Sequence, residues 1–248
     1  MIEILLFGLA AAAAEISGGI IIVLKKNWPR RLQETLLALG AGYILALVLL
    51  KLIPVSIATI GETAALMVIV GFAVIHFFEH TVVAHLHFGE ETHADVMVSK
   101  AATLSAFTGL FIHSFFDGFS ISAGIQFNYS IGILVFLAVL LHKFPEGLTI
   151  GSIMHAAGYS RNVVLFSAIG IGLATILGVV AVVLMARLDE TMVGMAFAFS
   201  AGAALYVGAS DLIPEINKSK DRIPPLVVFA GMLLFYGTDL LVERILLR

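Results

Sequence analysis

Apolar runs of about 20 residues recur along the whole chain and are separated only by short polar breaks. A helix of that length crosses a hydrocarbon core of about 30 Å, and it satisfies its own backbone hydrogen bonds where no water is present. The runs predict eight transmembrane helices, at 4–24, 33–57, 63–84, 101–126, 131–156, 162–186, 191–213 and 224–246. Since 60% of the residues are hydrophobic and 12% are charged, no segment is left for a soluble domain. We therefore predict an all-α integral membrane protein, with residues 1–248 in a single transmembrane domain.

Basic residues are concentrated on one side of these predicted helices. They follow the first, third, fifth and seventh helices, at Lys25, Lys26, Arg30, Arg31, Lys100, Arg161, Lys218, Lys220 and Arg222. The positive-inside rule then places both chain termini outside the cytoplasm. The compactness of the chain favours a plasma membrane of the bacterial inner-membrane type.

An internal repeat relates the first three predicted helices to the last three. A shift of 160 residues places Gly18 on Gly178, Gly42 on Gly202 and Leu52-Ile53-Pro54 on Leu212-Ile213-Pro214, without gaps; Gly71 then falls on Gly231 and Glu79 on Asp239. The two copies start five helices apart, so they cross the membrane in opposite directions. We predict a 3+2+3 inverted repeat around the fourth and fifth helices, an arrangement typical of secondary transporters with a site near the bilayer midplane.

The fourth and fifth predicted helices carry nearly the same segment, His113-Ser-Phe-Phe-Asp117-Gly118 and His142-Lys-Phe-Pro-Glu146-Gly147. A histidine and a carboxylate four residues apart share one helix face, so two facing helices would bring two imidazoles and two carboxylates together. Such ligands suit zinc and other first-row divalent ions. Zinc, cadmium, iron, manganese and cobalt stay open at this point, as does a hydrogen-bonded pair or proton relay without any metal.

These two segments resemble the signatures of the ZIP (Zrt-/Irt-like) family of divalent-metal transporters, which read His-x-x-x-acid-Gly and His-x-x-Pro-Glu-Gly. The resemblance covers the full chain. It implies that His113, Asp117, His142 and Glu146 form the principal transport site. A divalent metal, zinc foremost, would move into the cytoplasm by alternating access of one helix bundle against the other. The chain would then be a transporter and not an enzyme, with the metal as its cargo and no prosthetic group.

The chain departs from family members that hold two metal ions. Where those members have further ligands, it has Ser114, Lys143 and Thr175. We therefore expect a single metal ion. One hypothesis is that the Lys143 ammonium stands near the position of a second cation and compensates Glu146; the alternative is that it pairs with Asp211.

Several other polar residues are candidates for the transport pathway. Asp211 and Glu215 flank the Leu-Ile-Pro segment at the inner end of the seventh helix, where acids would draw cations toward the cytoplasm, and His155 is a candidate exit ligand. The segment between the third and fourth helices could sample released metal. Its polar residues are His85, His87, Glu90, Glu91, His93 and Asp95.

Two other functions remain open from the sequence. His76, Glu79 and His80 match the His-x-x-Glu-His pattern of one metalloprotease class, which makes an intramembrane protease an alternative. The other reading is that they line the cytoplasmic end of the transport pathway or satisfy one another in the bundle. A proton-coupled carrier of a non-metal solute would show no metal dependence. For partners we expect the lipid bilayer and a divalent metal ion, with a homodimer through an apolar helix face left open, and no nucleic acid.

Overall fold

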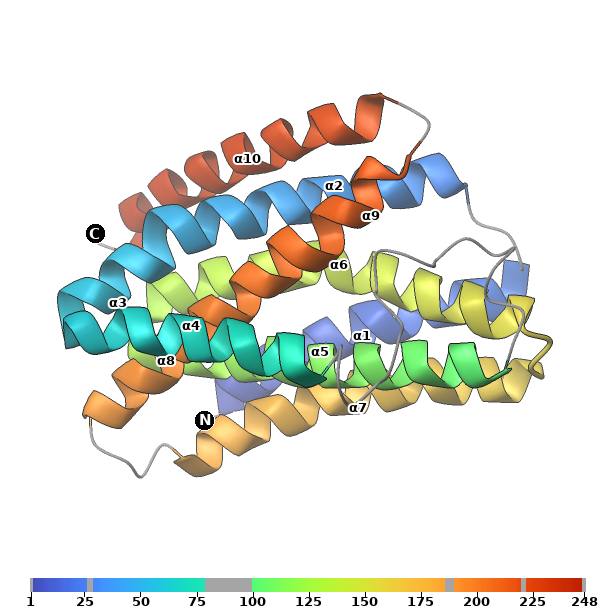
Figure 1. The fold of residues 1–248 in the computed structure, drawn as a ribbon, viewed down its shortest axis with the longest axis horizontal. Helices are drawn as coiled ribbons and strands as arrows, with labels where there is room; N and C mark the ends of the chain where they lie inside the picture. The colour runs from blue at the N-terminus through green and yellow to red at the C-terminus, as the bar shows by residue number, and fades with distance from the viewer. Residues whose placement is uncertain (1, 26–28, 79–99, 186–189, 220–221, 247–248) are drawn as a thin grey trace.

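The computed structural model describes residues 2–25, 29–78, 100–185, 190–219 and 222–246, which are helical throughout apart from short turns and contain no strand. The long helices are α1 (Ile2–Lys25), α2 (Arg30–Leu47), α4 (Glu62–Phe77), α5 (Lys100–Phe127), α6 (Tyr129–Ala156), α7 (Arg161–Met185), α8 (Glu190–Tyr206) and α10 (Ile223–Leu246). Two of them are prolonged: α2 by η1 (Val48–Leu52) and α3 (Ile53–Ile60), and α8 by η3 (Val207–Leu212) and α9 (Ile213–Asn217). The described residues thus form eight helical rods (Figure 1).

These rods confirm the predicted all-α membrane architecture. Six carry an apolar stretch long enough to span a bilayer by length and composition. The other two are α4, an apolar helix of 16 described residues, and α5, whose 28 residues are interrupted by His113, Ser114 and Asp117. The polar residues that interrupt α5 belong to the candidate site.

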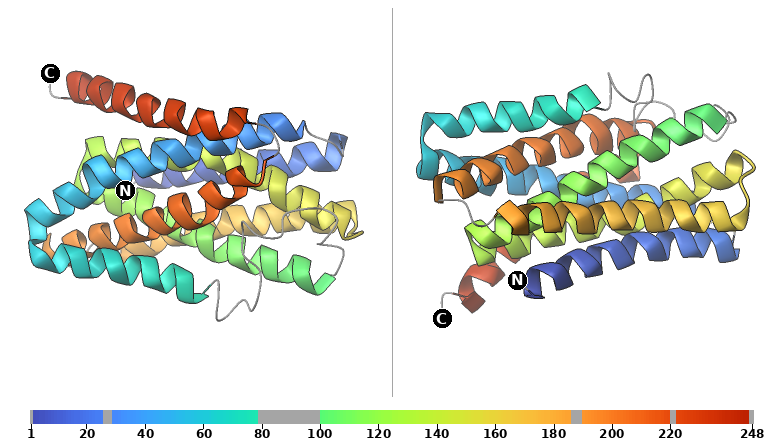
Figure 2. Two further views of the ribbon diagram at one scale, coloured as in Figure 1. Left: turned by 45° about the horizontal axis from the view of Figure 1, so that its top comes forward. Right: turned by 90° about the horizontal axis from the view of Figure 1, so that it is seen from below.

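The rods pack as two groups. In the first, α1, α5, α6 and α7 contact one another; in the second, α2 packs along α10 and α4 along α8. Figure 2 shows α4 beside α8 on one side of the molecule, and α1 beside α7 on the other. The groups meet where α2 lies on α6 and α8 lies on α5.

The contact between the two groups is largely apolar, and small side chains line part of it beside larger ones such as Leu37, Leu134 and Phe197. Ala38 and Ala41 of α2, Ala138 of α6, and Ala198 and Ala201 of α8 are buried in one hydrophobic cluster. The α2 and α8 alanines are partners under the 160-residue shift. The two copies thus place alanines at matching positions of this contact.

Helix packing follows the predicted inverted repeat. A Cβ at Gly42 would overlap the carbonyl oxygen of Val228, and a Cβ at Gly202 would overlap that of Val68, the matching residue of the other copy. Two further glycine pairs, Gly71/Gly231 and Gly18/Gly178, also face matching backbone carbonyls. Close helix approach at small residues is a main source of packing in membranes, and here both copies use it at the same positions.

The two Leu-Ile-Pro segments have the same local structure as well. Each follows a π-helical turn, η1 before Pro54 and η3 before Pro214. Proline has no N–H to donate and its ring crowds the carbonyl four residues earlier, and a π-turn is one way in which a helix accommodates such a break. The π-turn in the second copy contains Asp211.

A single residue connects α5 to α6. Asn128 is the N-cap of α6, and its side-chain oxygen accepts a hydrogen bond from the Ile131 backbone N–H at 3.2 Å. The helices on either side have 28 residues each, so that His113 and His142 are each the fourteenth residue, counted from Lys100 and Tyr129. Both histidines therefore lie halfway along a rod.

Both chain termini lie at the same end of the bundle (Figure 1). The opposite end carries the C-terminal end of α1, at Lys25, and the starts of α5 and α7, at Lys100 and Arg161. Three of the basic residues that served to predict the orientation, Lys25, Lys100 and Arg161, thus lie at the end away from the termini.

We predict that Gly42→Ala and Gly202→Ala each lower the free energy of unfolding by about 1–3 kcal/mol, because the added methyl group forces two helices apart. Thermal unfolding of the detergent-solubilised chain measures the effect. Gly237→Ala is the matched control, since a Cβ there meets nothing within 4 Å. Equal midpoints for Gly42→Ala and Gly237→Ala would contradict the packing described above.

Candidate metal centre

Four buried side chains from α5 and α6 converge at the middle of the bundle. His113, Asp117, His142 and Glu146 each offer one ligand atom, and these atoms all lie within 4.8 Å of one another. His113 Nε2 lies 2.7 Å from Glu146 Oε1 and 3.3 Å from Asp117 Oδ2, while His142 Nε2 lies 3.2 Å from the same Asp117 oxygen. The arrangement offers two imidazole nitrogens and two carboxylates to one point, a donor set that suits zinc and similar ions.

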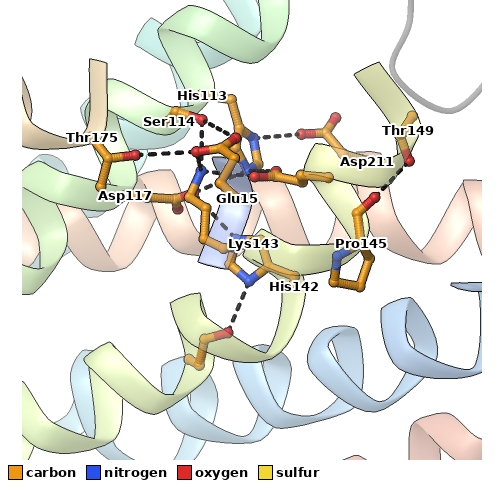
Figure 3. Close-up of polar contacts among 12 residues, drawn as sticks. Glu15, His113, Ser114, Asp117, His142, Lys143, Pro145, Thr149, Thr175 and Asp211 are labelled. Carbon is orange, nitrogen blue, oxygen red and sulfur yellow. Dashed lines mark hydrogen bonds and ion pairs between the residues drawn. The ribbon is translucent and has the colours of Figure 1, made fainter. Parts of the chain in front are cut away.

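Both imidazoles are oriented for coordination through Nε2. His142 Nδ1 lies 2.8 Å from the Ala138 carbonyl oxygen, which can only accept a hydrogen bond, so Nδ1 carries the proton. His113 Nδ1 faces Asp211 Oδ2 at 3.7 Å (Figure 3). A carboxylate or carbonyl behind a histidine fixes the tautomer that leaves Nε2 available to a metal. Each ring thus presents Nε2 to the centre.

Glycines next to the two motifs bring a third and a fourth helix to the site. A Cβ at Gly118 would overlap the carbonyl oxygen of Thr175 on α7, and a Cβ at Gly147 would overlap that of Glu15 on α1. With only hydrogen at these positions, α7 and α1 approach the α5–α6 pair closely. Their side chains at the same level therefore reach the cluster.

Lys143 lies among the carboxylates of this cluster and is fully buried. Its Nζ is 2.7 Å from Glu146 Oε2, 2.9 Å from Asp117 Oδ2 and 3.5 Å from Glu15 Oε2, and it donates a hydrogen bond to Ser114 Oγ at 2.6 Å. Of the two predicted arrangements, the structure has the one in which the ammonium faces Glu146, whereas Asp211 lies against His113.

Sequence reasoning missed Glu15. Its side chain is fully buried on α1, accepts a hydrogen bond from Ser114 Oγ at 3.1 Å, and lies 3.5 Å from Thr175 Oγ1 (Figure 3). Two signals could have identified it: an acid in the middle of an apolar run is functional by default, and the 160-residue shift places it on Thr175.

Comparison with known families agrees with this geometry. The profile described as ZIP zinc transporter matches residues 87–242, more than half of the chain. The chain belongs to the ZIP family. The matched range includes both histidine motifs of α5 and α6.

Similarity to curated ZIP proteins is moderate. The chain is 28% identical over 157 residues to the zinc transporter ZIP9 of Micropogonias undulatus, covering 60% of this chain and 50% of that one. It is 32% identical over 117 residues to ZIP9 of Macaca fascicularis, covering 44% and 50%, and 28% identical over 169 residues to ZIP6 of Homo sapiens, covering 64% and 22%. The chain thus spans about half the length, or less, of these relatives.

ZIP proteins are transporters and not enzymes, which agrees with the sequence-based prediction and leaves the metalloprotease alternative without support. Of its three residues, His76 is exposed on α4 with its ring against Tyr206, at 5.9 Å between centroids. Glu79, His80 and the polar segment 85–95 lie outside the described residues. His155 is exposed in the last turn of α6, about 13 Å beyond Glu146 at the normal rise of a helix.

The two acids predicted to lie on the transport pathway, Asp211 and Glu215, are placed differently. Asp211 is buried in η3 and faces the cluster, while Glu215 follows one turn later in α9. The counterpart of Asp211 in the other copy is Lys51. Its Nζ pairs with Asp239 at 3.0 Å and Glu243 at 2.6 Å, so its charge is balanced by α10.

We predict that Asp211→Ala weakens zinc binding about 10- to 100-fold, because His113 loses the group that orients its ring. Calorimetric titration of the purified chain measures the change. Asp211→Asn keeps an oxygen facing Nδ1 and should lose less. Zinc affinity that is unchanged in Asp211→Ala would show that the carboxylate does not position His113.

Proposed function

We propose that this ZIP chain carries a divalent transition metal ion across the membrane into the cytoplasm, with zinc foremost and cadmium, iron and manganese as further candidates. The observation that carries the proposal is the cluster of His113, Asp117, His142 and Glu146 halfway along two central helices. Ionisable groups are costly at membrane depth. Their convergence from two helices related by the repeat supports a transport site on the symmetry axis.

Transport requires the helices to move, because the site is closed in this structure. His142 and Glu146 are 0% exposed, His113 is 2% exposed and Asp117 is 7% exposed. A metal ion can reach and leave these ligands only if the surrounding helices open first to one side and then to the other. We propose that the group formed by α1, α5, α6 and α7 moves against the group formed by α2, α4, α8 and α10.

The contact between the groups supports this motion. It is lined in part by buried alanines, whose short side chains interlock less than longer ones. The four proposed ligands all lie on α5 and α6, within one group. Asp211 lies on the other group, so the contact with His113 changes as the groups move.

We further propose that residues 1–248 act as one transport unit with both termini extracytoplasmic, in a plasma membrane of the bacterial inner-membrane type. The basic helix ends at the opposite end of the bundle support this orientation. Exposed leucines and phenylalanines along α10, such as Leu226, Phe229 and Leu233, suit contact with lipid. Homodimerisation through such a face stays a prediction.

Liposomes that contain the purified chain should take up zinc, and uptake should fall to background in His113→Ala and Glu146→Ala. His113→Ala removes an imidazole nitrogen from the site, and Glu146→Ala removes a carboxylate. Parallel assays with cadmium, iron and manganese rank the substrates.

Thr108→Ala and Ser152→Ala are matched controls on the same two helices, since each hydroxyl donates a hydrogen bond to a backbone carbonyl one turn earlier. Both should transport normally. If well-folded wild-type protein moves none of these metals, the proposal is wrong and a carrier of a non-metal solute becomes the better explanation.

Zinc binding should weaken as the pH falls from about 7.5 to about 5.5. Imidazole and carboxylate bind a metal only when deprotonated, and free imidazole takes up its proton near pH 6.5. Calorimetric titrations at a series of pH values measure the trend. A site built from carboxylates alone would lose affinity only at lower pH.

A further inference from the structure

Two contacts fix how α2 lies on α6. Gln33 Nε2 donates a hydrogen bond to Thr149 Oγ1 at 2.6 Å. A Cβ at Gly40 would lie 3.2 Å from His142 Cβ. On each helix the two contacts are seven residues apart, in opposite chain directions, so α2 and α6 run antiparallel in one continuous register. The same register pairs apolar residues along the line between the helices, Leu37 with Pro145, Ile44 with Ala138 and Leu47 with Val135.

The Gln33–Thr149 contact is the polar end of this line. The α2 residues that follow it, Leu37, Ile44 and Leu47, are buried in the hydrophobic cluster, whereas Gln33 is half-buried and Thr149 is 6% exposed. Apolar attraction has no direction, but a hydrogen bond tolerates only a narrow range of distances and angles. The amide therefore specifies the relative position of the two helices in a way that the apolar residues do not.

Thr149 connects this contact to the part of α6 that carries a proposed ligand. Its hydroxyl donates to the Pro145 carbonyl oxygen at 3.0 Å (Figure 3), and its oxygen accepts from Gln33. Pro145 has no N–H, so α6 lacks a backbone hydrogen bond at this point. Glu146 lies between Pro145 and Thr149 in the same turn. The Gln33 amide thus holds the turn of α6 from which Glu146 reaches the cluster.

The contact joins the two helix groups at one end of the bundle. Gln33 is the fourth residue of α2, counted from Arg30, and Thr149 lies in the C-terminal part of α6. Both helix ends lie away from the chain termini (Figure 1), which is the cytoplasmic end in the proposed orientation. Since α2 belongs to one group and α6 to the other, the groups cannot separate at this end without breaking the bond.

The inverted repeat provides no second copy of this contact. The 160-residue shift places Gln33 on Val193, and the 29-residue shift that relates the two histidine motifs places Thr149 on Ser120. A valine side chain has no hydrogen-bond donor. The symmetry-related position, toward the other end of the bundle, therefore cannot form an equivalent bond.

We propose that the Gln33–Thr149 hydrogen bond keeps the two helix groups closed at the cytoplasmic end, which makes Gln33 a positioning residue for transport. The inference rests on the proposed movement of the two groups. Opening toward the cytoplasm separates α2 from α6 at Gln33 and breaks the bond, whereas opening on the other side leaves it intact. Loss of one neutral hydrogen bond of this kind shifts an equilibrium about two- to tenfold.

The test uses the absence of cysteine from the chain. Leu37→Cys places a single thiol next to Gln33, and Leu47→Cys places one toward the other end of the line; the leucines are 4% and 1% exposed. A water-soluble maleimide reaches such a thiol only when the groups open, so the rate of modification reports the open population. Gln33→Leu should raise the rate about two- to tenfold in the Leu37→Cys chain, and leave it unchanged in the Leu47→Cys chain.

Gln126→Leu is the matched control. Gln126 Nε2 also donates to a hydroxyl, Ser122 Oγ at 3.3 Å, but both residues lie on α5 and therefore within one group. This variant should change neither rate. Gln33→Met is measured in parallel in case Gln33→Leu fails to fold.

Variants of Thr149 test whether Gln33 acts through this hydroxyl. Thr149→Ser keeps the acceptor oxygen and should behave as wild type. Thr149→Val removes it and should raise the Leu37→Cys rate as Gln33→Leu does. The two changes together should raise the rate no further, because both remove the same bond.

A reversible crosslink tests the link to transport. Gln33→Cys and Thr149→Cys, joined by a short methanethiosulfonate crosslinker, should stop zinc uptake into liposomes, and a reducing agent should restore it. The same crosslink between Ser122→Cys and Gln126→Cys lies within α5 and should leave uptake unchanged.

The decisive quantity is the ratio of modification rates with and without the Gln33 amide. A ratio of one for Leu37→Cys in a folded chain, or an equal rise for Leu37→Cys and Leu47→Cys, would overturn the proposal. The thiol assay needs no metal ion. A rise at Leu37→Cys alone, in a chain that transports no metal, would therefore contradict the proposed function while supporting the closing role of Gln33.

Discussion

Carboxyl groups buried at the middle of a membrane protein must find partners there, and the centre of this structure is arranged around that need. An isolated charge in hydrocarbon is expensive, and a buried pair persists only with good geometry and further hydrogen bonds. Glu15, Asp117 and Glu146 meet this condition through Lys143, and Asp211 meets it through His113. The close helix contacts at Gly118 and Gly147 follow from it, because they bring α7 and α1 near enough to complete the network.

The inverted repeat determines how the helices pack, and the positions at which the two copies differ determine the charged and polar groups near the axis. Backbone contacts match between the copies, as at Gly42 and Gly202, and so do the π-turns before Pro54 and Pro214. The side chains near the axis do not match between the copies. Glu15 corresponds to Thr175, Ser114 to Lys143, and Asp211 to Lys51. A symmetric scaffold lets one side of the membrane differ from the other through a few substitutions, without a change of fold.

The fold could be predicted from the sequence because its signals are strong and local. Apolar runs fix the rods to within a few residues, and glycines in register reveal the repeat that the packing then uses. The four candidate ligands were found because helix periodicity alone brings His113 near Asp117 and His142 near Glu146. Glu15 was missed although it is an acid within an apolar run, because that signal does not say which side chains it meets, and its contacts depend on how α1 crosses the neighbouring helices. The direction of the Lys143 side chain likewise depends on two other helices, α1 and α5, so the sequence left two arrangements open.

The single-residue link at Asn128 has a consequence for how a bound metal ion could be released. Two helices joined with no slack, capped at the turn and packed along their length, keep the two halves of the ligand set at a fixed separation. Such a pair cannot release an ion by separation of α5 from α6. In the proposed transport cycle, release would depend on what surrounds the ion: water reaching it from one side, and neighbouring acids competing for it, while the ligands themselves keep their spacing.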